Sequence, residues 1–255
     1  MTDRSPSPER RLTLEIWIVL GLTLGQSGVY ALVSLIRKAT LPGGIGNQTA
    51  TLNGSQDFRE VFDFVYQVLD LAFAIVPVLL VLYLLSQDDV RERVSRRLGL
   101  DRTRPGFDLL SGVALLAVIG IPGLAFYGLG RLLGITAEII PAPDLTYWWT
   151  GIILVLAAIK NAVLEEVIVI GYLITRLKQL RWGTPAAIVA AATLRGSYHL
   201  YQGIGPFFGN FAMGLVFGYW FHRTKRVMPL VIAHALIDIV AFVGYLLLAD
   251  TLGLK

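Results

Sequence analysis

Two adjacent carboxylates, Glu165 and Glu166, lie in the middle of a long apolar run that also contains Lys160. The run extends over residues 147–174 and is long enough to cross a bilayer. A charged side chain near the middle of such a helix costs about 2.5–3.5 kcal/mol on insertion scales. Because nothing in the helix requires that cost, we interpret these residues as a candidate functional site. The alternative is a buried ion pair that only fastens helices together.

The later apolar runs carry further polar side chains at helical spacing. Three pairs lie four residues apart: Asn161 with Glu165, Arg195 with His199, and His234 with Asp238. Residues at this spacing share one face of a helix. In a bilayer, such a face is turned toward the interior of the bundle rather than toward lipid. We therefore expect three helices to present polar pairs to one common interior site.

A carboxylate together with two imidazoles can activate water in two ways. In the first, Glu165 takes a proton from a water molecule positioned by His199, while His234 helps to stabilise the oxyanion of a tetrahedral intermediate. In the second, His199, His234, Glu165 and Asp238 are candidate ligands of a zinc ion that lowers the pKa of its own bound water to about 7. The residues leave both open, so no cofactor is certain and zinc is the candidate metal. Each histidine could also serve only as a hydrogen-bonding link between helices.

The composition defines the class of protein. The chain has 255 residues, of which 55% are hydrophobic and 16% are charged, and its mean hydropathy is +0.65. This is too apolar for a soluble domain of that size, so we predict an all-α polytopic membrane protein. The absence of cysteine excludes disulfides and cysteine-ligated metal sites. Nothing in the sequence supports a nucleic-acid partner.

Seven apolar runs are expected to form transmembrane helices, and an eighth, re-entrant element is compatible with the sequence. The runs are residues 14–36, 61–85, 107–133, 147–174, 184–201, 205–221 and 228–249. Residues 1–13 are polar and are predicted to form a disordered cytoplasmic tail. We treat 14–250 as a single transmembrane domain with a catalytic-type core in 147–249.

The positions of the basic residues predict the orientation of the chain. With the N-terminus in the cytoplasm, the cytoplasmic segments hold 15 of the 22 Lys and Arg residues and the outer segments hold 5. An excess of Lys and Arg in cytoplasmic loops is the expected bias for membrane proteins. The sequence therefore favours a multi-pass protein with a cytoplasmic N-terminus.

The order of these motifs resembles that of the CAAX protease and bacteriocin-processing (CPBP) family of intramembrane endopeptidases. The family pattern is Glu-Glu-x-x-x-Arg, then Phe-x-x-x-His, then His-x-x-x-Asn or a related polar residue. The resemblance covers about residues 147–249. It implies that Glu165 is the general base, that His199 is its partner on the water, and that His234 with Asp238 forms an oxyanion or metal-binding pair. Glu166 completes the Glu-Glu motif.

Three positions depart from the family pattern. Ile170 stands in place of the motif arginine, Arg195 in place of phenylalanine, and Asp238 in place of asparagine. We hypothesise that Arg195, one helix away, supplies the missing positive charge by pairing with Glu166. An ionised Asp238 cannot donate a hydrogen bond to an oxyanion, but it can orient His234 or bind a metal.

The resemblance implies hydrolysis of a membrane-tethered peptide or protein, with the lipid bilayer as the surroundings. In eukaryotic relatives it implies CAAX-type substrates, and in bacterial relatives peptide maturation or immunity. The short loops favour a bacterial plasma membrane. Two alternatives remain: an inactive family member that serves as a scaffold or accessory subunit for a membrane-protein partner, and a proton-coupled transporter with Lys160, Glu165 and Asp70 as a relay.

Overall fold

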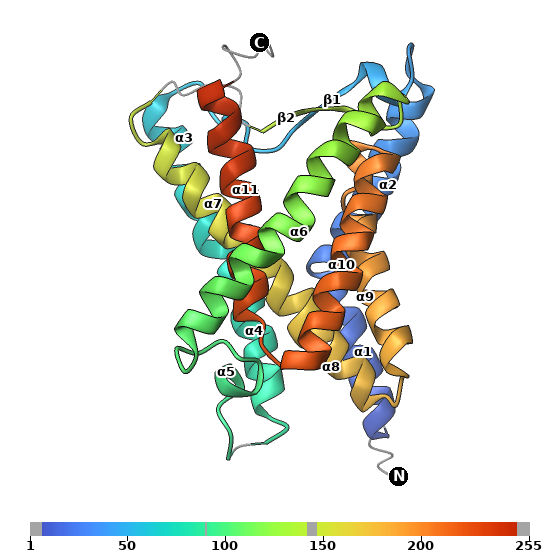
Figure 1. Cartoon of the computed structure of the whole chain (residues 1–255), viewed down its shortest axis with the longest axis vertical. Coiled ribbons are helices and arrows are strands. Elements are labelled where there is room, and N and C mark those ends of the chain that lie inside the picture. The colour runs from blue at the N-terminus through green and yellow to red at the C-terminus, as the bar shows by residue number, and fades with distance from the viewer. Residues whose placement is uncertain (1–6, 90, 142–146, 249–255) are drawn as a thin grey trace, which may run out of the picture.

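The computed structural model describes residues 7–89, 91–141 and 147–248. Helices make up most of these residues, and one small sheet joins two loops (Figure 1). The chain is therefore nearly all-α, as the composition predicts.

The first part of the chain contains α1 (Pro8–Gly21), α2 (Leu24–Thr40), the 3₁₀ turn η1 (Ile45–Asn47), α3 (Glu60–Phe73), α4 (Ile75–Ser86), α5 (Val94–Arg97) and α6 (Pro105–Leu132). Helix α1 begins inside the predicted tail. The side chain of Ser7 accepts a hydrogen bond from the Arg10 amide, and Pro8 occupies the first turn. Both features favour a helix start. Residues 1–6 of that tail lie outside the described residues.

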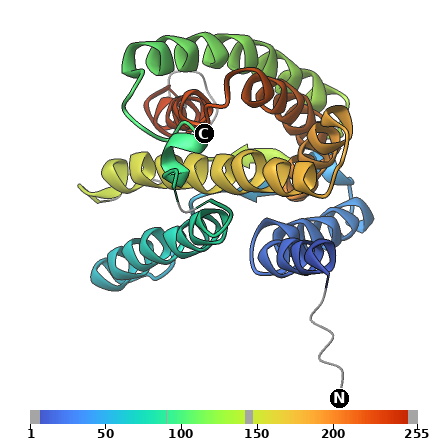
Figure 2. The same cartoon turned by 90° about the horizontal axis from the view of Figure 1, so that it is seen from below.

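The second part contains α7 (Thr150–Glu165), the π-helical segment η2 (Glu166–Leu173), α8 (Ile174–Gln179), α9 (Thr184–Ser197), the 3₁₀ turn η3 (Leu200–Gln202), α10 (Ile204–Thr224) and α11 (Met228–Leu248). Helices α7 and α8 are joined by η2 without a break, and together they form one long element through the molecule (Figure 2). Helix α9 ends at Ser197, so the predicted helical run to residue 201 is wrong at its end. The predicted end of the last run, at 249, lies outside the described residues.

The helices follow the long axis of the molecule in alternating directions. In Figure 1 the chain rises through α1 and α2, descends through α3 and α4, rises through α6 and descends through α7 and α8. It then rises through α9, descends through α10 and rises again through α11. Such a path suits a helical bundle in a bilayer.

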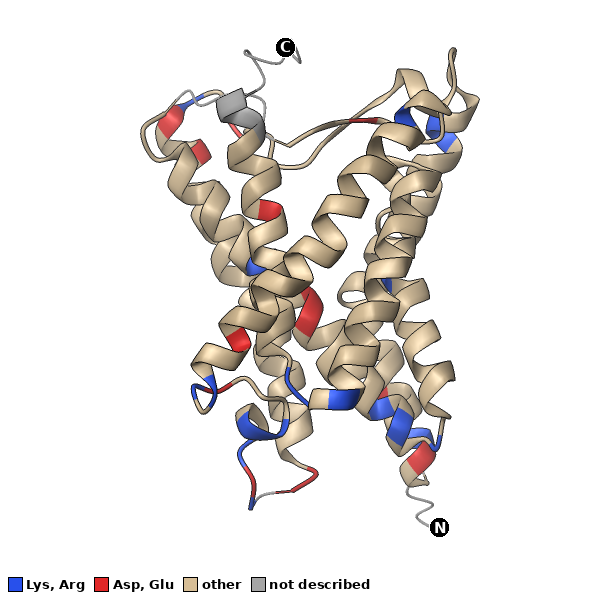
Figure 3. Ribbon diagram, viewed as in Figure 1, with Lys and Arg blue, Asp and Glu red and all other residues tan. Residues whose placement is uncertain are grey.

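Among the described residues, two helices and one bent helix pair are long and apolar enough to cross a membrane. Glu60–Ser86, which joins α3 and α4, and Pro105–Leu132 each meet this requirement. The pair α1 and α2 meets it as one span with a 51° bend. Lys and Arg gather at the lower end of the bundle (Figure 3). The number of spans and the cytoplasmic N-terminus remain predictions.

A small parallel sheet lies at the opposite end from this basic region (Figure 1). Strand β1 (Thr49–Thr51) pairs with β2 (Glu138–Ile140), and the Lys38 ammonium donates to the carbonyls of Thr49 and Tyr201 at 2.8 and 2.6 Å. These strands could not be predicted from the sequence, because three residues are too few to establish an alternating pattern.

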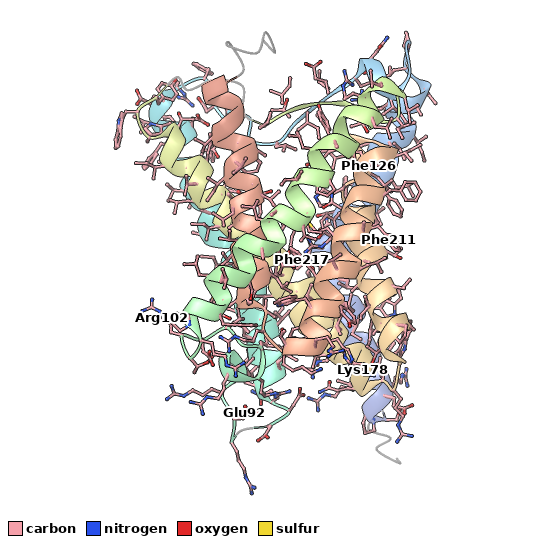
Figure 4. All side chains as sticks on the ribbon, viewed as in Figure 1. Glu92, Arg102, Phe126, Lys178, Phe211 and Phe217 are labelled. Atoms are coloured by element: carbon pink, nitrogen blue, oxygen red, sulfur yellow. The ribbon has the colours of Figure 1, made fainter. Side chains whose placement is uncertain are left out.

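Helices α9 and α10 pack very closely against each other. A Cβ atom added at Gly214 would lie 2.7 Å from the Ala192 Cα atom, so only glycine permits this approach. Phe217, one turn further on α10, is fully buried in the middle of the molecule (Figure 4). This packing fixes the end of α9, from which the polar side chains of the interior project.

Candidate active site

The two central carboxylates lie at the junction between two kinds of helix. Glu165 is the last residue of α7, and Glu166 begins the π-helical segment η2. Residues 167–170 are all β-branched and Gly171 follows, so helix propensity is low here. Short π-helical segments inside α-helices occur frequently at functional sites.

Glu166 is fully buried and joins three helices. Its Oε1 atom accepts hydrogen bonds from the Arg195 guanidinium on α9 and from His234 Nδ1 on α11, the latter at 2.7 Å. The ion pair with Arg195 is the contact that the sequence analysis hypothesised. Glu166 therefore anchors a cation and an imidazole at one point in the interior.

Arg195 is also fully buried, and its charge lies 5.4 Å from the centre of the Phe217 ring. Its Nε and Nη1 atoms have no hydrogen-bond partner among the described residues. Ile170, at the motif position of arginine, is fully buried in the apolar core. The positive charge next to the Glu-Glu pair thus comes from α9 in this chain.

Glu165 differs from Glu166 because its side chain is only partly buried. Its Oε2 atom accepts a 2.7 Å hydrogen bond from the Tyr198 hydroxyl. His234, His199 and the positive charge of Arg195 all lie near this carboxylate. Glu165 is therefore the accessible carboxylate of the pair, and positively polarised groups surround it.

His199 lies in the turn after α9 rather than on the helix itself. Its Nδ1 atom is 3.0 Å from the Arg195 carbonyl oxygen. Since a carbonyl only accepts, Nδ1 carries the proton in this contact, and in the neutral ring Nε2 is left as an acceptor. The ring centre lies 4.8 Å from that of Tyr198. His199 can therefore accept a hydrogen bond from a water molecule through Nε2.

Asp238 lies one helical turn beyond His234 on α11. Its Oδ2 atom is 3.7 Å from His234 Nε2. The side chain of Asn161 on α7 lies next to the same carboxylate. Helices α7 and α11, which carry two of the three predicted polar pairs, therefore meet at this point. Glu166, rather than Asp238, makes the direct hydrogen bond to His234.

The candidate zinc ligands do not form a metal site. Among the described residues, no group of three or more His, Asp or Glu side chains is arranged to hold a metal ion. The set of His199, His234, Glu165 and Asp238 therefore does not fit zinc in this arrangement.

Lys160 lies apart from the central cluster. Its ammonium forms a 2.9 Å ion pair with Asp70 on α3, whose side chain is 56% exposed. Glu165, the third member of the relay considered above, is bonded to Tyr198 instead. The Lys160–Asp70 ion pair and the Glu165 carboxylate therefore make separate contacts.

Tyr198 was not among the predicted site residues. Its hydroxyl is the direct partner of Glu165, yet an aromatic residue in an apolar run is usually a packing residue. The available signal was its place beside His199, at the end of a helix that already carried polar residues.

Long apolar helices that enclose a carboxylate and histidine cluster define an integral membrane protein with a buried polar site. A comparison with family models then gives one match, to the later part of the chain. The model described as "Rce1-like: Type II CAAX prenyl endopeptidase Rce1-like" matches residues 147–240, a segment that contains all of the cluster. The predicted family resemblance is therefore confirmed, and it is one to CAAX-type intramembrane proteases. No curated protein matches the chain, and no solved structure matches it.

Proposed function

We propose that the protein is an intramembrane endopeptidase that hydrolyses a membrane-tethered peptide or protein with water activated by Glu165. One observation carries this proposal. Of the two adjacent carboxylates, Glu166 is held by Arg195 and His234 in the interior, while Glu165 is partly exposed and hydrogen-bonded to Tyr198. A general base must reach its water, and Glu165 is the carboxylate that can.

In the proposed reaction, Glu165 takes a proton from a water molecule that also donates to His199 Nε2. The water oxygen forms a bond to the scissile carbonyl carbon and gives a tetrahedral oxyanion. The carbon–nitrogen bond then breaks as protonated Glu165 returns its proton to the leaving nitrogen. The products are a carboxylic acid and an amine, so protons and electrons balance.

The remaining residues position this chemistry. Glu166 accepts a hydrogen bond from His234 Nδ1, so Nε2 is the ring nitrogen left for the oxyanion, and it donates there when the ring carries its second proton. Asp238 then orients His234 from beside Nε2 and need not donate to the oxyanion itself. Arg195 adds a fixed positive charge close to both carboxylates. We place the protein in a bacterial plasma membrane.

The two alternatives make different demands on the residues. An accessory subunit that has lost catalysis does not need an accessible Glu165 bonded to Tyr198, and the missing motif arginine has a replacement in Arg195. A relay through Lys160 and Asp70 would need a continuation to Glu165, which bonds to Tyr198 instead.

The test is single-turnover cleavage in proteoliposomes with a pool of membrane-anchored peptides. We expect wild type to cleave at least one peptide and the folded variants Glu165→Gln and His234→Ala to cleave none. Glu60→Gln makes the same Glu-to-Gln substitution at the start of α3, so it is the matched control and should cleave normally. Absence of cleavage by wild type, together with a copurifying membrane protein, would favour the accessory subunit.

A further inference from the structure

A groove of about 520 Å³ lies between α2 and the turn that follows α9. Its volume is within the range of about 300–1,000 Å³ that is typical of ligand sites. Its lining comprises Gln26, Ser27, Tyr30, Ala31 and Ser34 of α2, together with Tyr198 and Tyr201. The mechanism described above uses none of the α2 residues.

The α2 wall of the groove is polar although α2 belongs to a candidate membrane span. Within the described residues, the side chains of Gln26 and Ser34 make no hydrogen bond, and Ser27 has only a 3.5 Å contact with the Thr23 carbonyl. Polar groups within a membrane span need a partner, because lipid offers none. The groove therefore requires water or a polar ligand.

One lining residue, Tyr198, connects the groove to the proposed catalytic carboxylate. Tyr198 lines the groove and donates the hydrogen bond to Glu165. At the outer edge Tyr30 is exposed, and its neighbour Val29 is exposed on the same helix. A chain that lies in the groove would therefore extend from the lipid-facing surface of the bundle towards Glu165.

We propose that this groove binds an extended segment of the membrane-anchored peptide substrate and delivers its scissile bond to Glu165. Gln26 offers both a donor and an acceptor, and Ser34 offers a hydroxyl, so both can pair with peptide N–H and C=O groups. An extended peptide in a bilayer needs such partners, whereas a lipid acyl chain does not. This inference rests on the proposed function and names its substrate-binding residues.

Disulfide cross-linking tests the groove without using activity. The chain has no cysteine, so Ser34→Cys introduces its sole thiol. In a Glu165→Gln background the peptide stays uncleaved, and copper phenanthroline oxidises that thiol and a cysteine beside the scissile bond to a disulfide. Val33→Cys is the matched control, since this neighbour is 62% exposed and does not line the groove.

We expect Ser34→Cys to form the adduct at least tenfold faster than Val33→Cys, and cysteine-free peptide to compete. Equal cross-linking rates at the two positions would overturn the proposal that the groove binds the peptide. Cross-linking at Ser34→Cys without any wild-type cleavage would support the groove and contradict the hydrolase. Cleavage without selective cross-linking would support the hydrolase and contradict peptide binding in the groove.

Kinetics provide a second readout. Gln26→Leu keeps a similar size but removes both hydrogen-bonding groups, so we expect KM to rise about three- to tenfold with little change in kcat. Gln87→Leu, the same change at an exposed position after α4, should leave KM unaltered. An unchanged KM in Gln26→Leu would contradict the role of this side chain.

Discussion

Replacing Arg195 by methionine would remove one partner of a fully buried ion pair. In wild type both Arg195 and Glu166 have no exposed surface, and Glu166 Oε2 has no hydrogen-bond partner among the described residues. The variant would leave a buried carboxylate whose remaining contact is with His234. Removal of one partner from such a pair costs about 3–5 kcal/mol. We expect a loss of that size in the free energy of unfolding, together with loss of cleavage.

The measurement is reversible unfolding in mixed detergent and dodecyl sulfate micelles, followed by the fluorescence of the five tryptophans. The double variant Arg195→Met with Glu166→Leu replaces the pair by apolar side chains, and it should regain at least half of the lost stability because no charge stays buried alone. It should remain inactive. A single variant that costs less than about 1 kcal/mol, or a double variant that loses the sum of both single changes, would refute this reasoning.

Three further predictions concern other contacts. Tyr198→Phe removes the 2.7 Å hydrogen bond to Glu165, the proposed general base, so the single-turnover rate should fall about tenfold or more. An unchanged rate would exclude a role for the hydroxyl. Lys160→Met breaks an ion pair whose carboxylate is largely exposed, so unfolding and cleavage should change little; loss of proton-driven uptake in that variant would instead support the transporter. Hydrogen bonds from Thr103 and then from Arg226 lower the pKa of Asp101 from 3.8 to about 2. This carboxylate therefore contributes stability above pH 4 that is lost as the pH falls towards 2, and the difference in unfolding free energy between wild type and Asp101→Asn should disappear over that range.

The pairing of Arg195 with Glu166 could be predicted because few arrangements are available to two charges in an apolar interior. An arginine and a carboxylate on adjacent apolar runs lower each other's cost of burial, so they are expected to meet. The nearly all-α fold followed from composition in the same way, because lipid requires backbone groups to bond within the helix.

The partner of Glu165 could not be predicted from spacing. Spacing along a helix gives the face of a residue, but the choice of Tyr198 depends on how the end of α9 is turned toward α7. The π-helical segment after Glu165 also shifts the direction of later side chains relative to an α-helix. His199 illustrates the same limit, since the run predicted to residue 201 contains it, whereas helix α9 ends at Ser197.

The most direct test of the central claim compares Glu165→Gln with Glu166→Gln on one cleaved peptide. Single-turnover rates would be measured in water enriched in ¹⁸O. The unfolding transition of each variant would show that it is folded. We predict that wild type places one ¹⁸O atom in the new carboxyl group, that Glu165→Gln lowers the rate by at least about a hundredfold, and that Glu166→Gln also lowers stability. Normal cleavage by folded Glu165→Gln would contradict the account.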